Sequence, residues 1–290
     1  MRDDEVPQLL LDLGLPGIVD VHTHFMAPPI MAKVWKYFDS AGPLLGREWP
    51  IVYRGTDDER VEHLRSMGVR KFSALSYAHK PGIAGYMNDW TLSFADRTPD
   101  ALRSATFFPE PEAATYVPQL VADGVEVFKV HVQVGDFAPN DPLLEPVWGV
   151  LAESGTPIVL HAGSGPAPGH HTGPAGVADV LARHPDLALV IAHLGMPETE
   201  EFLDLAEKHE NVRLDTTMVF VDFWDHQPVP GDVVPRLVDL QDKILFGTDF
   251  PNIPYAYAHQ IEALQRLDLG DDWLGRVLWH NGAELFGVSA

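Results

Sequence analysis

The sequence predicts an α/β protein with parallel strands, and three observations carry this prediction. Short runs rich in β-branched residues recur along the 290 residues of the chain. Each run is followed by a longer segment with the periodicity of an amphipathic helix. No linker divides the chain into independent parts. Because strands that alternate with helices form parallel sheets, eight such units in one chain of this length predict a single-domain (β/α)8 TIM barrel over residues 1–290.

Eight strands are predicted from the β-branched runs, the first reading GIVDVHTH and the last KILFGTDFP. They are expected at residues 17–24, 71–77, 103–108, 125–133, 157–163, 187–195, 212–218 and 243–251. Helical periodicity fills the segments between them. The helices are expected at residues 57–68, 88–100, 111–124, 141–155, 174–186, 197–211, 232–242 and 257–270. Pro197 and the acidic residues that follow it are typical of a helix start.

Two further segments belong to the same plan. Residues 1–14 are expected to form an N-terminal extension, and residues 25–56 a long first βα loop. The glycine-rich segment 163–176 also follows a strand directly, so both loops are expected over one mouth of the barrel. An open doubly wound sheet is the structural alternative. Such a sheet usually carries a glycine fingerprint after its first strand, where this chain has the residues HTH.

The composition narrows the kinds of site and partner. With 42 acidic against 20 basic residues the formal net charge is −22, which disfavours nucleic acids and anionic membranes as partners. The chain has no cysteine, so a metal would be bound by His, Asp, Glu or a modified Lys. No signal peptide or membrane-spanning run is recognised, and a cytoplasmic location is expected. The expected partner is a small-molecule substrate, and the sequence leaves a homodimer open.

Histidines and one aspartate gather at the carboxyl ends of the predicted strands. His22 and His24 are two residues apart in the first strand, so their side chains point to the same face. His161 ends the fifth predicted strand, His193 the sixth, and Asp249 lies at the end of the eighth. Because the strands run parallel, these ends converge on the barrel face where active sites are built.

Imidazoles and a carboxylate without thiolates are typical ligands of zinc, with manganese or iron as alternatives. A catalytic site keeps one coordination position open for water, whose pKa falls to about 7 on zinc. Each residue also has a simpler structural explanation. Asp249 would suit a turn or a helix N-cap before Pro251, and His193 would suit a core histidine bonded to a backbone carbonyl.

In this order, VDVHTHF, the histidines at 161 and 193, and FGTDFP resemble the amidohydrolase superfamily, and within it the amidohydrolase-2 group with the aminocarboxymuconate semialdehyde decarboxylase relatives. The resemblance extends from about Gly17 to Phe286. It implies one divalent metal held by a set of four ligands: His22, His24, His161 and Asp249. It also implies that His193 is a catalytic or outer-sphere group and that Asp249 shuttles protons.

Further residues are candidates for binding substrate: Lys129, His131, His79 and Asp215. Lys129 is in phase with His131 on the fourth predicted strand. In binuclear relatives a carboxylated lysine on that strand bridges two metals, so a second metal is an open alternative. A structural ion pair of Lys129 with Asp215 or Glu126 is another, because an unpaired buried lysine is costly. The aromatic residues of segment 25–56 form a pocket wall, a small satellite core or a subunit contact.

The resemblance implies an enzyme but leaves its reaction open. We expect a metal-dependent hydrolase that uses activated water to cleave an amide, ester or lactone, with Asp249 and His193 as catalytic residues. The alternative is a decarboxylase for a small aromatic or enol acid, in which Arg47, Arg54 or Lys129 would hold the carboxylate. A binding barrel without catalysis is a third hypothesis, and it predicts a metal with no open coordination position.

Overall fold

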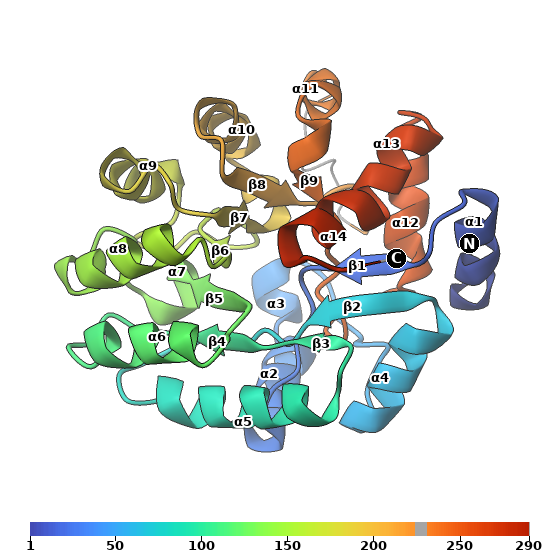
Figure 1. Cartoon of the computed structure of the whole chain (residues 1–290). Coiled ribbons are helices and arrows are strands. Elements are labelled where there is room, and N and C mark those ends of the chain that lie inside the picture. The colour runs from blue at the N-terminus through green and yellow to red at the C-terminus, as the bar shows by residue number, and fades with distance from the viewer. Residues whose placement is uncertain (224–230, 290) are drawn as a thin grey trace. The chain divides into compact units, whose positions relative to one another are not determined.

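The structure is a computed structural model and describes residues 1–223 and 231–289. Its internal contacts group the chain into two compact units. Unit 1 joins Met1–Phe72 to Thr216–Ala290, and unit 2 is Ser73–Asp215. In each unit strands alternate with helices, and the registered pairs of strands are parallel, as the sequence predicts (Figure 1). Within the described part of the chain, no helix has the length and apolar character that crossing a bilayer requires.

Unit 2 is built on parallel strands that pair in sequence order. These strands are β4 (Ser104–Thr106), β5 (Val127–His131), β6 (Ile158–His161), β7 (Leu189–Ile191) and β8 (Val212–Asp215). All five were expected, although each ladder is shorter than its β-branched run. A further short strand, β3 (Ala101–Leu102), was not expected. The register places His131 of β5 directly beside His161 of β6.

The helices of unit 2 lie along one face of these strands (Figure 1). They are α5 (Ala84–Arg97), α6 (Ala113–Ala122), α7 (Val132–Gly135), α8 (Glu145–Ser154), α9 (Pro174–Arg183) and α10 (Thr199–Lys208), with 3-10 turns η2 (Pro142–Leu144) and η3 (Ala192–Gly195). Helix α8 ends at Gly155, whose φ of 67° suits the glycine that the sequence places there. Glu200 and Glu201 occupy the first turn of α10, where the helix dipole favours acids.

Unit 1 contains the first and last strands of the chain. These are β1 (Ile18–Asp20), β2 (Val69–Ser73, whose last residue falls in unit 2) and β9 (Ile244–Leu245). Its helices are α1 (Val6–Asp12), α2 (Pro28–Ser40), α3 (Gly42–Leu45), α4 (Asp57–Ser66), α11 (Val234–Asp239), α12 (Ala258–Gln265), α13 (Asp271–Gly275) and α14 (Asn281–Phe286). Short turns η1 (Asp3–Glu5) and η4 (Gln241–Lys243) and the π-helical η5 (Arg276–His280) complete it.

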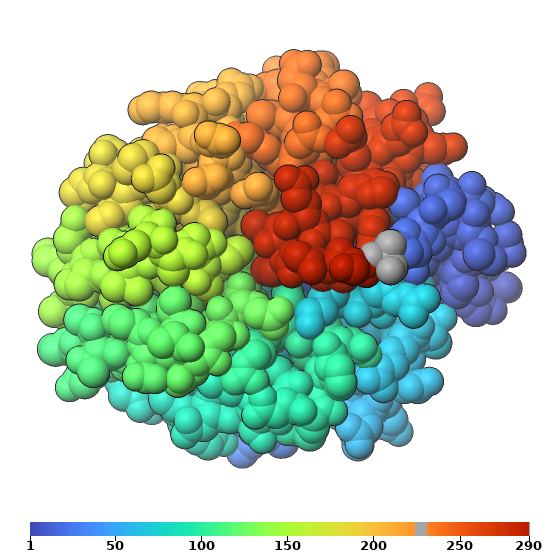
Figure 2. All heavy atoms as spheres, in the orientation of Figure 1, coloured from blue at the N-terminus to red at the C-terminus, as the bar shows by residue number. Residues whose placement is uncertain are grey.

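Two contacts in unit 1 follow directly from the sequence. At the start of α4, the Thr56 hydroxyl accepts from Glu59 N at 3.2 Å while the Glu59 carboxylate accepts from Thr56 N at 2.8 Å, a reciprocal capping box. At the other end of the chain, a Cβ on Gly282 of α14 would lie 2.8 Å from the Val19 side chain. Glycine therefore lets α14 pack closely on β1, and the red atoms of this region cover β1 in the space-filling view (Figure 2).

Residues 1–14 and 25–56 contain more regular structure than expected. The N-terminal extension forms η1 and α1, and its Val6 and Leu10 are buried. The first βα loop contains α2 and α3, which were not predicted as helices. Helix α5 begins at Ala84, four residues before the predicted start.

Candidate metal centre

Backbone pairing in unit 1 brings the HTH segment beside the GTDF segment. Val21 N donates to Phe246 O at 2.9 Å, Asp249 N to His22 O at 2.8 Å, and His24 N to Phe250 O at 2.7 Å. A parallel bridge also joins Thr23 and Phe250. The two segments are more than 220 positions apart in the chain, and this pairing fixes which side chains meet at their ends.

The side chains of His22, His24 and Asp249 converge as the sequence predicts. Asp249 Oδ1 lies 3.1 Å from His22 Nε2 and 3.0 Å from His24 Nε2. One ligand atom from each residue lies within 4.8 Å of the other two. The histidines are 1% and 5% exposed, while the Asp249 side chain keeps 20% of its surface accessible. The carboxylate is therefore partly accessible to solvent.

This donor set fits a divalent cation. Bonds of about 2.0–2.1 Å to zinc place neighbouring ligand atoms of a tetrahedron about 3.3 Å apart. The distances of 3.0 and 3.1 Å therefore need only a slight expansion to admit a cation between the three groups. Two neutral imidazoles and a carboxylate are also a common ligand combination for zinc. His161 belongs to unit 2, and its place as the fourth ligand remains a prediction.

Asp249 and His193 both adopt the left-handed backbone conformation. Their φ values are 64° and 57°, and Leu194 follows His193 at 49°. Non-glycine residues in this region store strain and concentrate at functional sites. Asp215 supports the turn at His193, since its Oδ1 accepts from His193 N at 2.8 Å. The strained turn at His193 thus depends on the carboxylate of Asp215, which was predicted from the sequence to bind substrate.

Asp20 supports the cluster of His22, His24 and Asp249 through hydrogen bonds to the segments that carry these residues. It is fully buried, and its Oδ1 accepts from His22 N at 3.1 Å. Its Oδ2 accepts from the Thr248 hydroxyl at 2.7 Å and from the Tyr257 hydroxyl at 2.9 Å. One carboxylate therefore ties the strand that carries the histidines to the residue that precedes Asp249. We did not single out Asp20 from the sequence, although its position two residues before His22 in VDVHTH is the signal.

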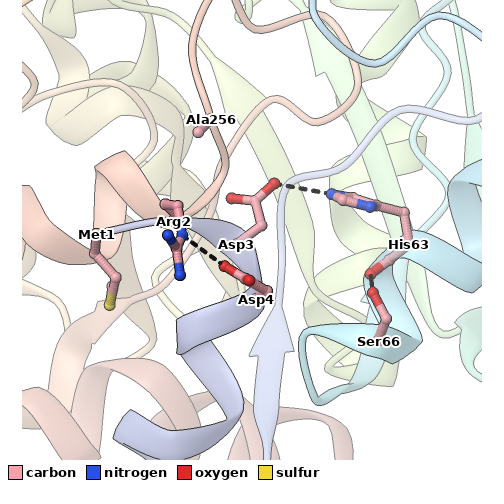
Figure 3. Close-up of a pocket in the computed structure, with 7 residues that line it drawn as sticks. All are labelled: Met1, Arg2, Asp3, Asp4, His63, Ser66 and Ala256. Atoms are coloured by element: carbon pink, nitrogen blue, oxygen red, sulfur yellow. Dashed lines mark hydrogen bonds and ion pairs between the residues drawn. The ribbon is translucent and has the colours of Figure 1, made fainter.

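A second set of hydrogen bonds, centred on Asp3, connects the N-terminal segment to the segment that contains Tyr257. Asp3 accepts from the Tyr53 hydroxyl at 2.5 Å and from Ala258 N at 2.9 Å, and it lies 2.9 Å from His63 Nε2. Tyr257 N in turn donates to the Tyr53 hydroxyl at 2.5 Å. Figure 3 shows the Asp3 carboxylate directed at His63. Both residues line a pocket of about 520 Å³. The N-terminal extension is therefore bonded to the segment that holds Tyr257.

The environment of Asp3 favours its ionised form. Burial alone would raise its pKa, but hydrogen bonds from His63, Tyr53 and Ala258 outweigh burial and hold the pKa below the usual 3.8. Burial, and then the hydrogen bond to the Asp3 carboxylate and its negative charge, raise the pKa of the Tyr53 hydroxyl far above its ordinary value. His63 is paired with this carboxylate, since its Nε2 lies 2.9 Å from Asp3 Oδ2.

In unit 2, the predicted histidines form a stack. The rings of His131 and His161 lie 3.9 Å apart with 12° between their planes, and His193 meets His161 edge-on at 4.8 Å. His161 Nε2 is 3.0 Å from the Gly165 carbonyl oxygen, and His131 Nδ1 accepts from Val134 N at 3.4 Å as the N-cap of α7. The stack brings three predicted site residues together on β5, β6 and η3.

The remaining candidates for substrate binding also lie in unit 2. Lys129 is fully buried on β5, two positions before His131 in the same strand, so the two side chains point to the same face. Asp215 is fully buried at the end of β8. His79 is half-buried in the irregular segment after β2. Their roles in binding substrate remain predictions, as does a second metal at Lys129.

Aromatic residues of the first βα loop pack together in unit 1. Trp49 is 5% exposed, stacks on Phe38 at 5.1 Å and meets Phe223 edge-on at 5.1 Å. Trp35 Nε1 donates to Asn252 Oδ1 at 3.0 Å, and Asn252 N donates to Asp249 O at 2.8 Å. Tyr37, in contrast, is 50% exposed. The loop aromatics thus form a packed cluster that contacts the segment after Asp249.

The chain belongs to the amidohydrolase family. The model of the amidohydrolase-2 family, described as "Amidohydrolase", matches residues 19–288. Curated protein sequences gave no match. The match begins one residue before Asp20 and spans both units, so the family resemblance of the sequence is confirmed.

Solved structures show the same fold. An uncharacterized TIM-barrel protein from Bordetella bronchiseptica has a TM-score of 0.72 and 19% identity, with 94% of this chain and 99% of that chain covered. A 2,6-dihydroxybenzoate decarboxylase from Rhizobium has a TM-score of 0.67 and 17% identity, with 95% and 100% covered. A probable 2-pyrone-4,6-dicarboxylic acid hydrolase from Acinetobacter baumannii has a TM-score of 0.62 and 15% identity, with 93% and 99% covered. The predicted TIM-barrel fold is thereby confirmed.

Proposed function

We propose that this protein is a metal-dependent hydrolase that cleaves an amide, ester or lactone of a small organic molecule. The observation that carries the proposal is the convergence of His22, His24 and Asp249 within 4.8 Å. Membership of the amidohydrolase family and the order of the sequence motifs support His161 as the fourth ligand. Zinc is the metal we propose, because nitrogen and oxygen donors without thiolate suit it.

A bound divalent metal would supply Lewis acidity and lower the pKa of water toward about 7. Asp249 would then accept a proton from the attacking water, since its carboxylate is both part of the cluster and partly exposed. His193 would donate a hydrogen bond to the oxygen on which charge develops. Asp249 would return the proton to the leaving group. Asp215 would hold His193 in place, because its carboxylate accepts a hydrogen bond from the backbone N–H of His193.

The second candidate function is decarboxylation of a small aromatic or enol acid. The fold similarity to a 2,6-dihydroxybenzoate decarboxylase favours it as strongly as the similarity to a pyrone dicarboxylic acid hydrolase favours hydrolysis. A decarboxylase needs a cation for the acid group of its substrate. Arg47 lies 4.6 Å over the Phe223 ring, and Lys129 is buried on β5, so both are candidates for that contact.

Two measurements test these proposals. Mass-spectrometric metal analysis of the purified protein should find about one divalent ion per chain. A screen of the zinc-loaded protein against esters, lactones and amides should then detect cleavage that depends on water, while small aromatic acids should release no CO2. Release of CO2 without hydrolysis would establish the second candidate instead. A protein that takes up no divalent metal would refute both metal-dependent mechanisms.

A further inference from the structure

Asn252 lies three residues after Asp249 and is fixed at three of its polar groups within unit 1. Its backbone N–H donates to the Asp249 carbonyl oxygen at 2.8 Å, which closes a four-residue turn that begins at the candidate metal ligand. Its backbone carbonyl accepts from the Trp49 indole N–H at 2.7 Å, and its side-chain oxygen accepts from the Trp35 indole N–H at 3.0 Å. Asn252 is 4% exposed, so these bonds are formed with little competition from water.

The turn at Asp249 has a backbone conformation that needs support from its surroundings. Its φ of 64° lies in the left-handed region, which a non-glycine residue keeps only where other contacts hold it. On one side of the turn, Thr248 is held by Asp20, which accepts from its hydroxyl at 2.7 Å, and by Gln260, whose side-chain N–H donates to its carbonyl oxygen at 2.6 Å. On the other side, the bonds of Asn252 are the counterpart. The direction of the Asp249 carboxylate therefore depends on both sides of the turn.

Both indole donors come from the first βα segment, residues 25–56. An indole N–H can donate but not accept, so the contact with Trp35 also sets which end of the Asn252 amide faces it, namely the oxygen. The same segment adds a third bond nearby, because Val52 N donates to Ile253 O at 3.1 Å. Three donors from one segment therefore converge on two consecutive residues at the end of the turn.

The Trp35 ring is itself oriented by two guanidinium groups. Arg60 lies 5.2 Å and Arg54 5.5 Å from the ring centre, within the range of cation–π attraction. Arg60 is 5% exposed and also lies 5.6 Å over the ring of Phe25, the residue directly after His24. The contacts of one buried cation therefore connect the Trp35 indole with the segment that carries His24.

We propose that Asn252 is a positioning residue for Asp249 and that Trp35 acts through it. In this role the two residues set the direction of the Asp249 carboxylate at the centre formed with His22 and His24. This inference rests on the proposed metal-dependent function and adds to it residues that act through the backbone of a ligand. The sequence did not indicate this role, because Trp35 and Asn252 are 217 positions apart.

Cobalt(II) binding tests the proposal without a known substrate. Cobalt(II) replaces zinc, and its visible absorption spectrum responds to the number and direction of its ligands. Asn252→Ala removes the side-chain acceptor, and Trp35→Phe removes the indole donor but keeps an aromatic ring. Each variant should weaken cobalt binding about 10-fold, the lower end of the effect of groups that orient metal ligands, and should change the spectrum. Competition with a chelator of known affinity measures the loss.

Trp273→Phe is the matched control in unit 1. Trp273 is 3% exposed, and its indole N–H donates to the Leu237 carbonyl oxygen at 3.0 Å, so this variant also loses one indole hydrogen bond. Its melting temperature should fall at least as far as that of Trp35→Phe, because Trp35 is only half-buried. Its cobalt affinity and spectrum should nevertheless stay those of the wild type.

A double-mutant cycle tests whether Trp35 acts through Asn252. If it does, Trp35→Phe should weaken cobalt binding about 10-fold in the wild type but less than about twofold in Asn252→Ala. The contacts of Trp35 with Arg54 and Arg60 are present in both backgrounds, so the difference reports the hydrogen bond alone.

The outcomes that overturn the positioning role differ from those that refute the proposed function. Cobalt affinity that is unchanged in Trp35→Phe, or lowered equally in Trp35→Phe and Trp273→Phe, overturns the role and leaves the metal centre standing. Equal losses from Trp35→Phe in both backgrounds of the cycle also overturn it. A wild-type protein that binds no cobalt refutes the metal centre, and the positioning role with it. If Asn252→Ala does not fold, the comparison of Trp35→Phe with Trp273→Phe decides.

Discussion

Two groups of histidines in this chain differ in what their nitrogens face. In unit 1, His22 and His24 direct Nε2 at one carboxylate oxygen of Asp249, at 3.1 and 3.0 Å. In unit 2, His131, His161 and His193 stack face to face and edge to face, and two of them bond backbone groups. The first group is a donor set with a built-in negative charge. The second group is a packed layer of imidazoles, and the backbone N–H of its His193 donates to Asp215 Oδ1.

This difference shows that histidine content alone does not define a metal site. A cation gains most from an anionic ligand, and Asp249 supplies it only where the GTDF segment pairs with the HTH segment. The stack is better suited to hold ring orientations, because the planes of His131 and His161 differ by only 12°. His161 is the residue on which the comparison turns, since it lies in the stack and is also predicted to be a ligand.

Removal of a ligand should have the largest effect. Replacement of His22, His24 or Asp249 by alanine should weaken zinc binding by roughly 1000-fold, well beyond the 10- to 100-fold typical of outer-sphere residues. Competition with a chelator of known affinity measures this loss. His161→Ala should behave in the same way and lose turnover. His280→Ala, an exposed histidine in unit 1, is the control and should bind zinc like the wild type.

His161→Ala also tests whether His161 is a metal ligand or belongs only to the histidine stack. A His161→Ala protein that keeps full zinc affinity and full activity would place His161 with the stack only, and the four-ligand set would be wrong. Equal zinc loss in all four variants would instead assign His161 to both groups.

His193→Asn should affect turnover and leave the metal in place. The expected decrease in kcat is about 100- to 10,000-fold, the usual contribution of a positioned proton donor. Kinetics on a substrate from the ester, lactone and amide screen, with metal content measured in the same samples, checks this. If His193→Asn lost zinc in proportion to its activity, His193 would act as a ligand and not as a donor.

Asp20→Asn should have an intermediate effect on zinc affinity. Asp20 bonds His22 N and the Thr248 hydroxyl, and loss of such supporting groups lowers metal affinity about 10- to 100-fold. Isothermal titration with zinc measures the change. Asp12→Asn, at an exposed carboxylate, is the matched control. An unchanged affinity in Asp20→Asn would show that the ligand cluster holds its geometry without this support.

Asp3→Asn should have the smallest effect, and it should depend on pH. The pKa of Asp3 is lowered in the folded state, so its ionised form stabilises the fold above the ordinary value of 3.8, and this stabilisation is lost as the pH falls through the lower folded-state pKa. The melting temperature of Asp3→Asn should therefore lie below that of the wild type at pH 7, and the two should approach each other as the pH falls below the folded-state pKa of Asp3. Asp4→Asn, whose carboxylate is exposed, should show no such convergence, and an equal pH response in both variants would contradict the prediction.

Much of the fold and the ligand cluster could be predicted because both follow from local patterns. Alternation of side chains in VDVHTH places His22 and His24 on one face, and parallel strands place their carboxyl ends together. The left-handed turn at Asp249 carries no such pattern, since a helix N-cap was also compatible with the sequence before Pro251. The contacts of Asp3 with Tyr53 and Ala258 join residues 50 and 255 positions apart, and no periodicity reports them.

The helices of segment 25–56 were missed for the same reason. Helix α2 begins with two prolines after Phe25–Ala27 and is rich in aromatic residues, which favour loops and strands as often as helices. Its stability comes from packing of residues such as Met31, which is 2% exposed.

X-ray absorption at the zinc edge of the zinc-loaded protein tests the central claim most directly. If His22, His24 and Asp249 hold the metal, the spectrum will show nitrogen and oxygen ligands at about 2.0–2.1 Å with the outer scattering of at least two imidazole rings. That imidazole scattering will decrease in His24→Ala. A zinc ion surrounded by oxygen alone, or a spectrum that His24→Ala leaves unchanged, would contradict the account.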